Sequence, residues 1–157
     1  MQKVIEVSQY EQERGKTMPS KLHGRIQLKL GTALENAYGN KYSLFSELSL
    51  NLNDWDSVPD LSIYPKMEFT YSEDEVELTE APLCAIEILS PSQSLQELIV
   101  KARKYFSYGV KSCWLVIPLL KNVYVFSSPD DYQIFRDTQT LHDTVIDVRL
   151  ELSKVFS

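Results

Sequence analysis

A run of seven residues, 83–89, constrains the fold more than any other feature of the sequence. It reads LCAIEIL and is apolar at both alternating positions except for Glu87. A strand that is apolar on both faces is typical of the interior of a sheet covered on both sides. A single ionised carboxylate in such a strand is costly unless it is compensated. We therefore expect a central strand here, with Glu87 next to a basic group, a hydrogen-bonded position or a metal ion.

Two helices are predicted on either side of this strand in the sequence. Residues 20–38 carry apolar side chains at intervals of three and four, which is the pattern of one helix face. A second helix begins near Ser94, since Glu97 follows three residues later in a capping-box pattern, and Gly109 ends it. Another apolar run at 112–117 predicts a buried strand. A strand, a helix and a strand in this order predict a crossover between parallel neighbours.

The remaining segments predict more strands. Alternating apolar and polar residues indicate a strand at 42–52, and a shorter strand is expected at 60–64. Later strands are expected at 123–126, 132–136 and 145–148, before a terminal segment at 150–156, whereas residues 1–18 look like a lead-in element and a loop. Since 157 residues fit one domain, we predict a single α/β domain over 1–157, with a mixed sheet flanked by helices.

Composition excludes several classes of function. The chain has no apolar run near the ~20 residues needed to span a bilayer, and its N-terminus lacks the apolar stretch of a signal peptide, so the cytoplasm is the expected location. Cys84 and Cys113 lie in apolar runs without CxxC spacing, which gives no zinc signature and no expectation of a disulfide. The net charge of -6 disfavours general nucleic-acid binding. Any DNA contact must then come from a local basic patch, a partner subunit or a bound metal.

Asp60 and Glu87 are the candidate metal ligands. Asp60 opens the predicted strand at 60–64, and neighbouring strands lie about 4.8 Å apart, so both carboxylates can face one cleft. Two carboxylates can bind one Mg²⁺ ion, which suits phosphodiester hydrolysis by a metal-activated water. Lys101 is the candidate cation that completes the site. Arg103, Lys104 and Lys111 follow it in a compact basic cluster that could contact a DNA backbone.

The order of these motifs resembles a known family. The run from Pro59-Asp60 through Glu87 and Lys101 to Trp114 looks like a large bacterial family, abundant in cyanobacteria, of restriction-endonuclease-like proteins within the PD-(D/E)xK nuclease superfamily. The resemblance covers the chain from about residue 20 to its end. It implies a DNA endonuclease that uses Mg²⁺ or Mn²⁺ bound by Asp60 and Glu87.

The resemblance also assigns roles at positions where the sequence departs from the superfamily. The superfamily usually places a lysine two residues after the second acid, where this chain has Leu89. The resemblance implies that Lys101 on the following helix takes that place. Glu97 stands where the family commonly has an aspartate. His23 and Glu47 are accessory candidates, His23 from its place in the family pattern and Glu47 from the alternation of its strand.

Simpler interpretations of the same residues stay open. Lys101 lies four residues after Glu97, the favourable order for a surface ion pair on a helix. Asp60 after a proline is a common turn residue, and His23 near a helix start often caps or packs. The domain could also be a catalytically inactive nuclease fold that binds DNA or protein as a regulatory module. A third hypothesis is an interaction domain whose acidic segment 66–80 binds a basic partner. A homodimer would suit duplex cleavage.

Overall fold

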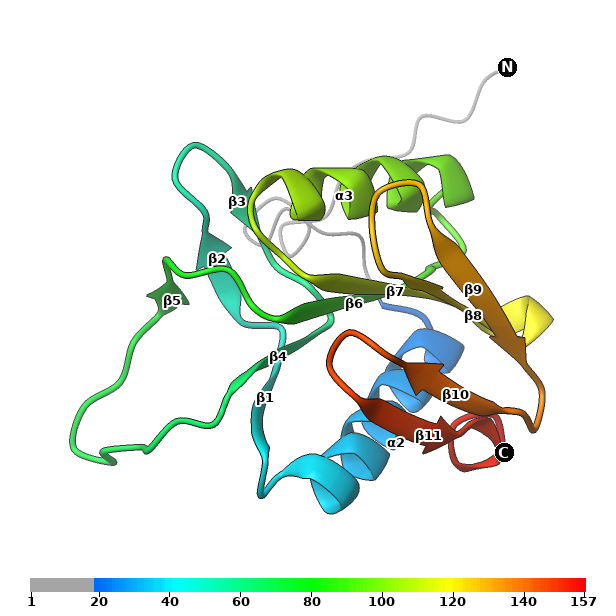
Figure 1. Cartoon of the computed structure of the whole chain (residues 1–157), viewed down its shortest axis with the longest axis horizontal. Coiled ribbons are helices and arrows are strands. Elements are labelled where there is room, and N and C mark those ends of the chain that lie inside the picture. Colours follow the sequence, from blue (N-terminus) through cyan, green and yellow to red (C-terminus); the bar gives the residue numbers. More distant parts are fainter. Residues whose placement is uncertain (1–18) are drawn as a thin grey trace.

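A six-stranded mixed sheet forms the centre of the protein, whose computed structural model describes residues 19–157 (Figure 1). The strand order is β1-β4-β6-β7-β8-β9. The strands are β1 (Tyr42–Ser46), β4 (Leu61–Pro65), β6 (Cys84–Ile88), β7 (Ser112–Ile117), β8 (Asn122–Phe126) and β9 (Tyr132–Arg136). Only β6 and β7 pair in parallel within this sheet, and the α/β class with a mixed, helix-flanked sheet is confirmed. The expected lead-in element at 1–18 lies outside the described residues.

Helix α2 (Lys21–Tyr38) covers one face of the sheet. Ser20 caps its start by accepting a hydrogen bond from the backbone N–H of His23. Its apolar face packs into a cluster with alternate residues of the central strands, among them Ile86 of β6 and Trp114 of β7. The helix residues in that cluster are Ile26, Leu30 and Leu34. The predicted helix at 20–38 is therefore confirmed, with its boundary one residue later.

Helix α3 (Leu95–Ser107) covers the opposite face and joins β6 to its parallel neighbour β7. The side chain of Ser94 accepts the backbone N–H of Glu97, as the capping pattern predicts. The helix residues Leu98, Ala102 and Tyr105 pack on the strand residues that alternate with the first cluster, Ala85, Cys113 and Leu115. After the helix, Gly109 takes a φ of 97°, which disfavours any residue with a Cβ. The predicted crossover and the burial of β6 on both faces are confirmed.

The predicted strand at 42–52 is wrong as a single element. It divides into β1 and β2 (Ser49–Asn51), and β2 belongs to a separate three-stranded sheet with β3 (Asp56–Ser57) and β5 (Glu77–Leu78). The break falls at Glu47, whose φ of 49° turns the chain out of the extended conformation. As a result, Leu44 packs on the α2 side of the main sheet, while Leu50 packs in a third cluster with Tyr64.

The predicted strand at 145–148 is also wrong in its bounds. The chain forms a hairpin of β10 (Thr140–Asp143) and β11 (Val148–Glu151), so residues 144–147 are the turn between them. The hairpin packs on the same side of the sheet as α2, through Leu141 and Val148. Short 3-10 turns, η1 (Pro118–Leu120) and η2 (Leu152–Lys154), complete the fold. Among residues 19–157, no helix combines the length and apolarity needed to cross a membrane.

Candidate active site

Glu87 is a buried carboxylate held by α3. It lies near the end of β6, where its residue is 2% exposed. Its Oε1 atom lies 2.8 Å from the ammonium nitrogen of Lys101 and accepts a hydrogen bond of 2.8 Å from the Tyr105 hydroxyl. Lys101 and Tyr105 are four residues apart, so both lie on the face of α3 that meets β6. Although Glu87 lies in an apolar run, its carboxylate therefore has both a cation and a hydrogen-bond donor as partners.

Asp60 lies beside Glu87 at the start of β4. The antiparallel register pairs Leu61 with Ile86, and continuing it by one residue puts Asp60 opposite Glu87. The buried Asp60 side chain accepts a hydrogen bond of 2.7 Å from the backbone N–H of Ile88. The expectation that the two strands are neighbours is thus confirmed, and Asp60 is bound to the same end of β6 that carries Glu87.

His23 connects α2 to this carboxylate. Its Nε2 atom lies 3.1 Å from Oδ2 of Asp60, and the side chain is 6% exposed. Because a carboxylate accepts, Nε2 carries the proton, and the Nδ1 atom of a neutral ring is then an acceptor. Within the described part of the chain, Nδ1 is buried without a hydrogen-bond partner. The backbone N–H of His23 donates to the Ser20 cap of α2, while its side chain contacts Asp60, so His23 has both a structural contact and a contact with the candidate site.

Lys101 stays charged because the carboxylates around it raise its pKa more than burial lowers it. Burial by itself would lower the pKa of the ammonium group, but the charge and hydrogen bond of Glu87, together with the charge of Asp60, raise that pKa above its ordinary value. The carboxylate of Asp60 is therefore near enough to act on the same cation as Glu87. The ion pair of Lys101 is with Glu87, so the alternative of a surface pair with Glu97 is not the arrangement in the structure.

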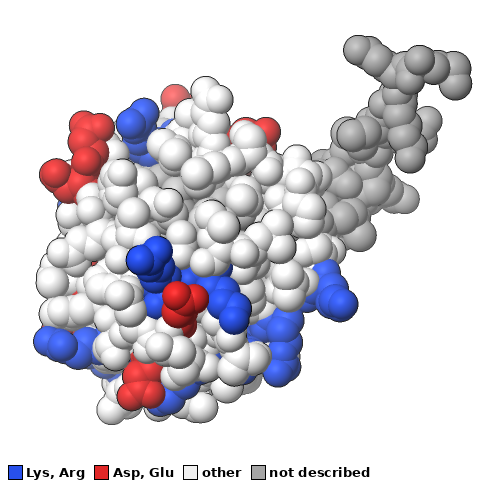
Figure 2. Space-filling view, turned by 90° about the vertical axis from the view of Figure 1, so that its right-hand side faces the viewer, with Lys and Arg blue, Asp and Glu red and all other residues white. Residues whose placement is uncertain are grey.

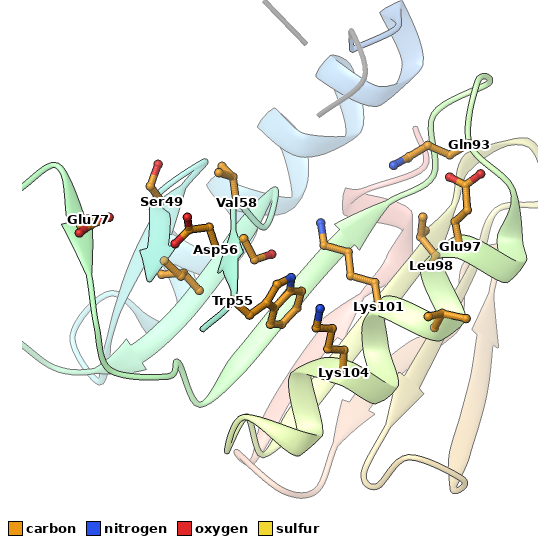
Figure 3. A pocket seen from close by; sticks show the side chains of 13 residues that line it. Ser49, Trp55, Asp56, Val58, Glu77, Gln93, Glu97, Leu98, Lys101 and Lys104 are labelled. Atoms are coloured by element: carbon orange, nitrogen blue, oxygen red, sulfur yellow. The ribbon is translucent and has the colours of Figure 1, made fainter. Parts of the chain in front are cut away.

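A cavity of about 650 Å³ opens next to this cluster (Figure 3). One wall is α3, which contributes Glu97, Lys101 and Lys104, and another is the segment around Trp55 and Ser57. The remaining lining residues are Ser49, Leu50, Asp56, Val58, Glu77, Gln93, Leu98 and Val100. The Lys101 side chain is 25% exposed, so it contacts Glu87 on one side and the cavity on the other.

Two further residues of the site were not assigned by the sequence. The Tyr105 hydroxyl, which donates to Glu87, also lies 2.7 Å from the Ser57 hydroxyl, which therefore donates to it. Burial and the neighbouring Glu87 charge raise the pKa of Tyr105 well above its ordinary value, so the phenol stays protonated. Tyr105 belongs to the apolar stripe of α3 and to the run of residues that resembles the family, but neither pattern gave it a role at the site, and no local pattern marks Ser57.

Glu47 and the residues of the basic cluster lie in different parts of the structure. Glu47 lines a second cavity on the α2 side, while its backbone N–H donates to the carbonyl oxygen of Asp60 (3.0 Å). In the basic cluster, Lys104 lies over the ring of Trp55, whereas Arg103 is directed toward Asp130 at 3.8 Å. Residues one or two apart on a helix point in different directions, which divides the cluster that looks compact in the sequence.

Positive charge gathers on another part of the surface. Figure 2 shows the side of the molecule on which α2 begins and η1 lies, and Lys and Arg side chains concentrate in its lower half with acidic residues among them. Lys21 and Arg25 are exposed on the first turns of α2, the helix that also carries His23. Although the chain as a whole is acidic, α2 carries exposed positive charge, and the same helix contacts Asp60 through His23.

The donor atoms of the cluster fit a hard divalent cation. Among residues 19–157, no group of three or more Asp, Glu, His or Cys side chains could hold a metal ion. Asp60 and Glu87 are two carboxylates acting on one ammonium group, and Mg²⁺ is commonly bound by one or two carboxylates, with waters and substrate phosphates as its other ligands. The pair therefore matches the oxygen chemistry of Mg²⁺ or Mn²⁺ better than that of a closed zinc site.

Comparisons with known proteins agree with this fold. The profile of the Uma2 family, described as "putative restriction endonuclease", matches residues 8–153. Among solved structures, the chain is similar to a protein from Anabaena variabilis described as a putative nuclease belonging to DUF820, with a TM-score of 0.74 and 22% sequence identity. That match covers 88% of this chain and 82% of the other. The comparison with curated proteins gave no match.

Proposed function

This chain belongs to the Uma2 family of putative restriction endonucleases, and from that premise we propose that it is a Mg²⁺- or Mn²⁺-dependent endonuclease that hydrolyses DNA phosphodiester bonds. Family membership supports a nuclease, and the expected resemblance to restriction-endonuclease-like proteins is confirmed. The observation that carries the proposal is the ammonium group of Lys101 beside the buried carboxylate of Glu87, next to Asp60 and at the wall of a cavity.

Asp60 and Glu87 are the proposed metal ligands. A divalent cation bound there would polarise a phosphoryl oxygen and lower the pKa of a water molecule that attacks phosphorus. The chain holds both carboxylates in place before any ligand arrives. The backbone N–H of Ile88 and Nε2 of His23 orient Asp60, and Tyr105 with Ser57 behind it orients Glu87. Such fixed contacts reduce the reorganisation needed during the reaction.

Lys101 is the proposed cation that stabilises the negative charge developing on the phosphate. Its position at the cavity wall lets the ammonium group reach a phosphate there while it stays close to Glu87. Preorganised positive charge in a site that excludes water is worth more than the same charge in bulk solvent. The neutral Leu89, at the usual lysine position of the superfamily, leaves this role to α3.

A plasmid cleavage assay tests this proposal. The protein should convert supercoiled DNA to nicked or linear forms with Mg²⁺ or Mn²⁺ and stop when EDTA is added. Glu87→Gln and Lys101→Met should each reduce cleavage at least a hundredfold, about 2.7 kcal/mol of transition-state stabilisation. Asp130→Asn removes an exposed acid that pairs with Arg103 and lies outside the cavity lining, and it should keep full activity.

The outcome of the same assay separates the proposal from its main alternative. Cleavage that survives both Glu87→Gln and Lys101→Met would exclude this site. If the folded protein shows no cleavage with either metal ion yet binds DNA in a salt-sensitive way, it is a catalytically inactive nuclease fold that serves as a binding module. Leu89, which stands at the usual lysine position of the superfamily, is the observation that favours this second function.

A further inference from the structure

We propose that the cavity beside Lys101 binds one unpaired nucleotide next to the phosphate that is cut, with its base against Trp55 and its phosphate near Lys104. This inference rests on the proposed nuclease function and narrows its substrate to DNA that is single-stranded or locally unpaired. The cavity lies against α3 on one side and the Trp55 segment on the other (Figure 3).

Trp55 is held in place by the turn that joins β2 to β3. Its carbonyl oxygen accepts the backbone N–H of Leu52 at 2.8 Å. Its ring packs against Tyr105, with centroids 4.9 Å apart, and against Tyr108, with centroids 5.3 Å apart. Tyr108 in turn donates a hydrogen bond to Asp54 in the same turn. The indole is half-buried, is anchored by the two tyrosines and lines the cavity, so the part of the ring at the cavity is a preorganised surface for a base.

Two cations border the indole on the side of α3. The ammonium of Lys104 lies 4.7 Å from the centroid of the Trp55 ring, and Lys101 extends into the same cavity one turn earlier on the helix. An aromatic ring with adjacent ammonium groups is the usual combination for binding single-stranded nucleic acid, because the ring stacks on a base while the cations pair with the backbone.

Carboxylates limit how much of a polyanion the cavity can hold. Asp56 and Glu77 lie beyond Trp55 on the strand side, away from the two lysines, and Glu97 lies toward the other end of the lining (Figure 3). Phosphates are therefore favoured at the lysines and repelled at both margins. A volume of about 650 Å³ lies in the range of small-molecule sites, which suits a nucleotide but not a duplex.

The stacking surface is connected to the proposed catalytic cluster. Ser57, two residues after Trp55, lines the cavity and bonds to the Tyr105 hydroxyl, which bonds to Glu87. Lys101 belongs both to the cavity wall and to the ion pair with Glu87. A base on Trp55 would thus lie beside the phosphate at Lys101. Within a duplex each base face is covered by its neighbours, so a base that stacks on Trp55 must be unpaired.

Binding measured in EDTA tests this subsite without cleavage. The probes are an oligothymidylate and a blunt duplex of equal length, each with a fluorescent label for anisotropy. The protein has two tryptophans, and Trp114 is 0% exposed, so quenching of tryptophan fluorescence by the oligothymidylate reports on Trp55. We expect tighter binding of the single strand than of the duplex, and quenching that disappears in Trp55→Phe.

Substitutions then identify the contacts. Trp55→Leu should weaken single-strand binding about tenfold, the loss of one base–aromatic stack, and leave duplex binding unchanged. Trp55→Phe keeps a ring and should keep most of the affinity. Lys104→Met should weaken binding and lower its salt dependence by about one counterion, whereas Lys111→Met, an exposed lysine outside the cavity lining, should not.

Two results would overturn the subsite: equal affinity for both probes, or unchanged single-strand affinity in folded Trp55→Leu. Its failure is distinguishable from that of the proposed function. Metal-dependent cleavage together with Trp55-independent binding leaves the nuclease and removes the subsite. Trp55-dependent binding without cleavage by either metal ion removes the nuclease and leaves a single-strand binding site.

Discussion

The ion pair between Lys101 and Glu87 makes a quantitative prediction about stability. In Lys101→Met the aliphatic stem stays, but Glu87 keeps only the Tyr105 hydroxyl and remains almost fully buried, with 3% of its side chain exposed. Loss of one partner of a buried pair costs about 3–5 kcal/mol. Since the Lys101 side chain is 25% exposed, water can partly replace the ammonium, and we expect about 2–3 kcal/mol.

The second single variant should cost less. In Glu87→Gln the amide oxygen still accepts from Tyr105, and Lys101 can turn into the cavity, so we expect a loss of about 1 kcal/mol. The double variant removes both charges together. It should be no less stable than Lys101→Met alone, which gives a coupling energy of at least about 1 kcal/mol between the two side chains.

Urea unfolding followed by circular dichroism measures these free energies. Equal slopes for all variants would show that the extent of unfolding is unchanged. A coupling of about 2 kcal/mol corresponds to a difference of roughly 4–8 °C in Tm for a chain of this size. The control is Lys111→Met, an exposed lysine outside the cavity lining. Additive effects of the two substitutions, within about 0.5 kcal/mol, would refute a direct interaction and with it the placement of Lys101 beside Glu87.

Two further predictions concern the buried core. Asp143→Ala should destabilise the protein by about 3 kcal/mol without changing metal affinity. The carboxylate accepts hydrogen bonds from Trp114 Nε1 at 2.7 Å and from a backbone N–H of the hairpin turn at 2.9 Å. An unchanged urea midpoint would contradict this prediction. Burial raises the pKa of the Cys84 and Cys113 thiols, so both should react with a thiol reagent only after unfolding. The raised pKa also has a defined sign. Below about pH 8 the thiols are protonated in both states, and at higher pH the unfolded chain loses thiol protons that the folded chain keeps, so the free energy of unfolding should fall as pH rises. Rapid labelling of the native protein would contradict this burial.

Local sequence patterns were sufficient to predict the elements that position the site. The apolar run around Glu87 predicted β6, and the Ser94 cap with its apolar stripe predicted α3, because both depend on residues close in sequence. The same patterns indicated that Glu87 needs a partner. They left the identity of that partner open between a lysine, a hydrogen bond and a metal ion, and the structure contains the first two.

Features that depend on distant residues could not be predicted in this way. The alternation of residues 42–52 continues through Glu47, and only the left-handed backbone of that residue divides the strand between two sheets. Asp143 lies between a histidine and a threonine without any apolar run, yet it is buried by its contact with Trp114, 29 residues away. Ser57 reaches the site only through Tyr105, 48 residues away. Such contacts are set by the packing of the whole sheet.

Calorimetric titration with Mn²⁺ tests the central claim most directly, namely that Asp60 and Glu87 bind one divalent cation together. The account predicts one ion per chain, affinity at least tenfold weaker in both Asp60→Asn and Glu87→Gln, and unchanged affinity in Asp143→Asn, a buried acid on the opposite side of the sheet from α3. If Mn²⁺ binds the folded wild-type protein and the two site variants with equal affinity, or does not bind the wild type at all, the metal-dependent nuclease is contradicted.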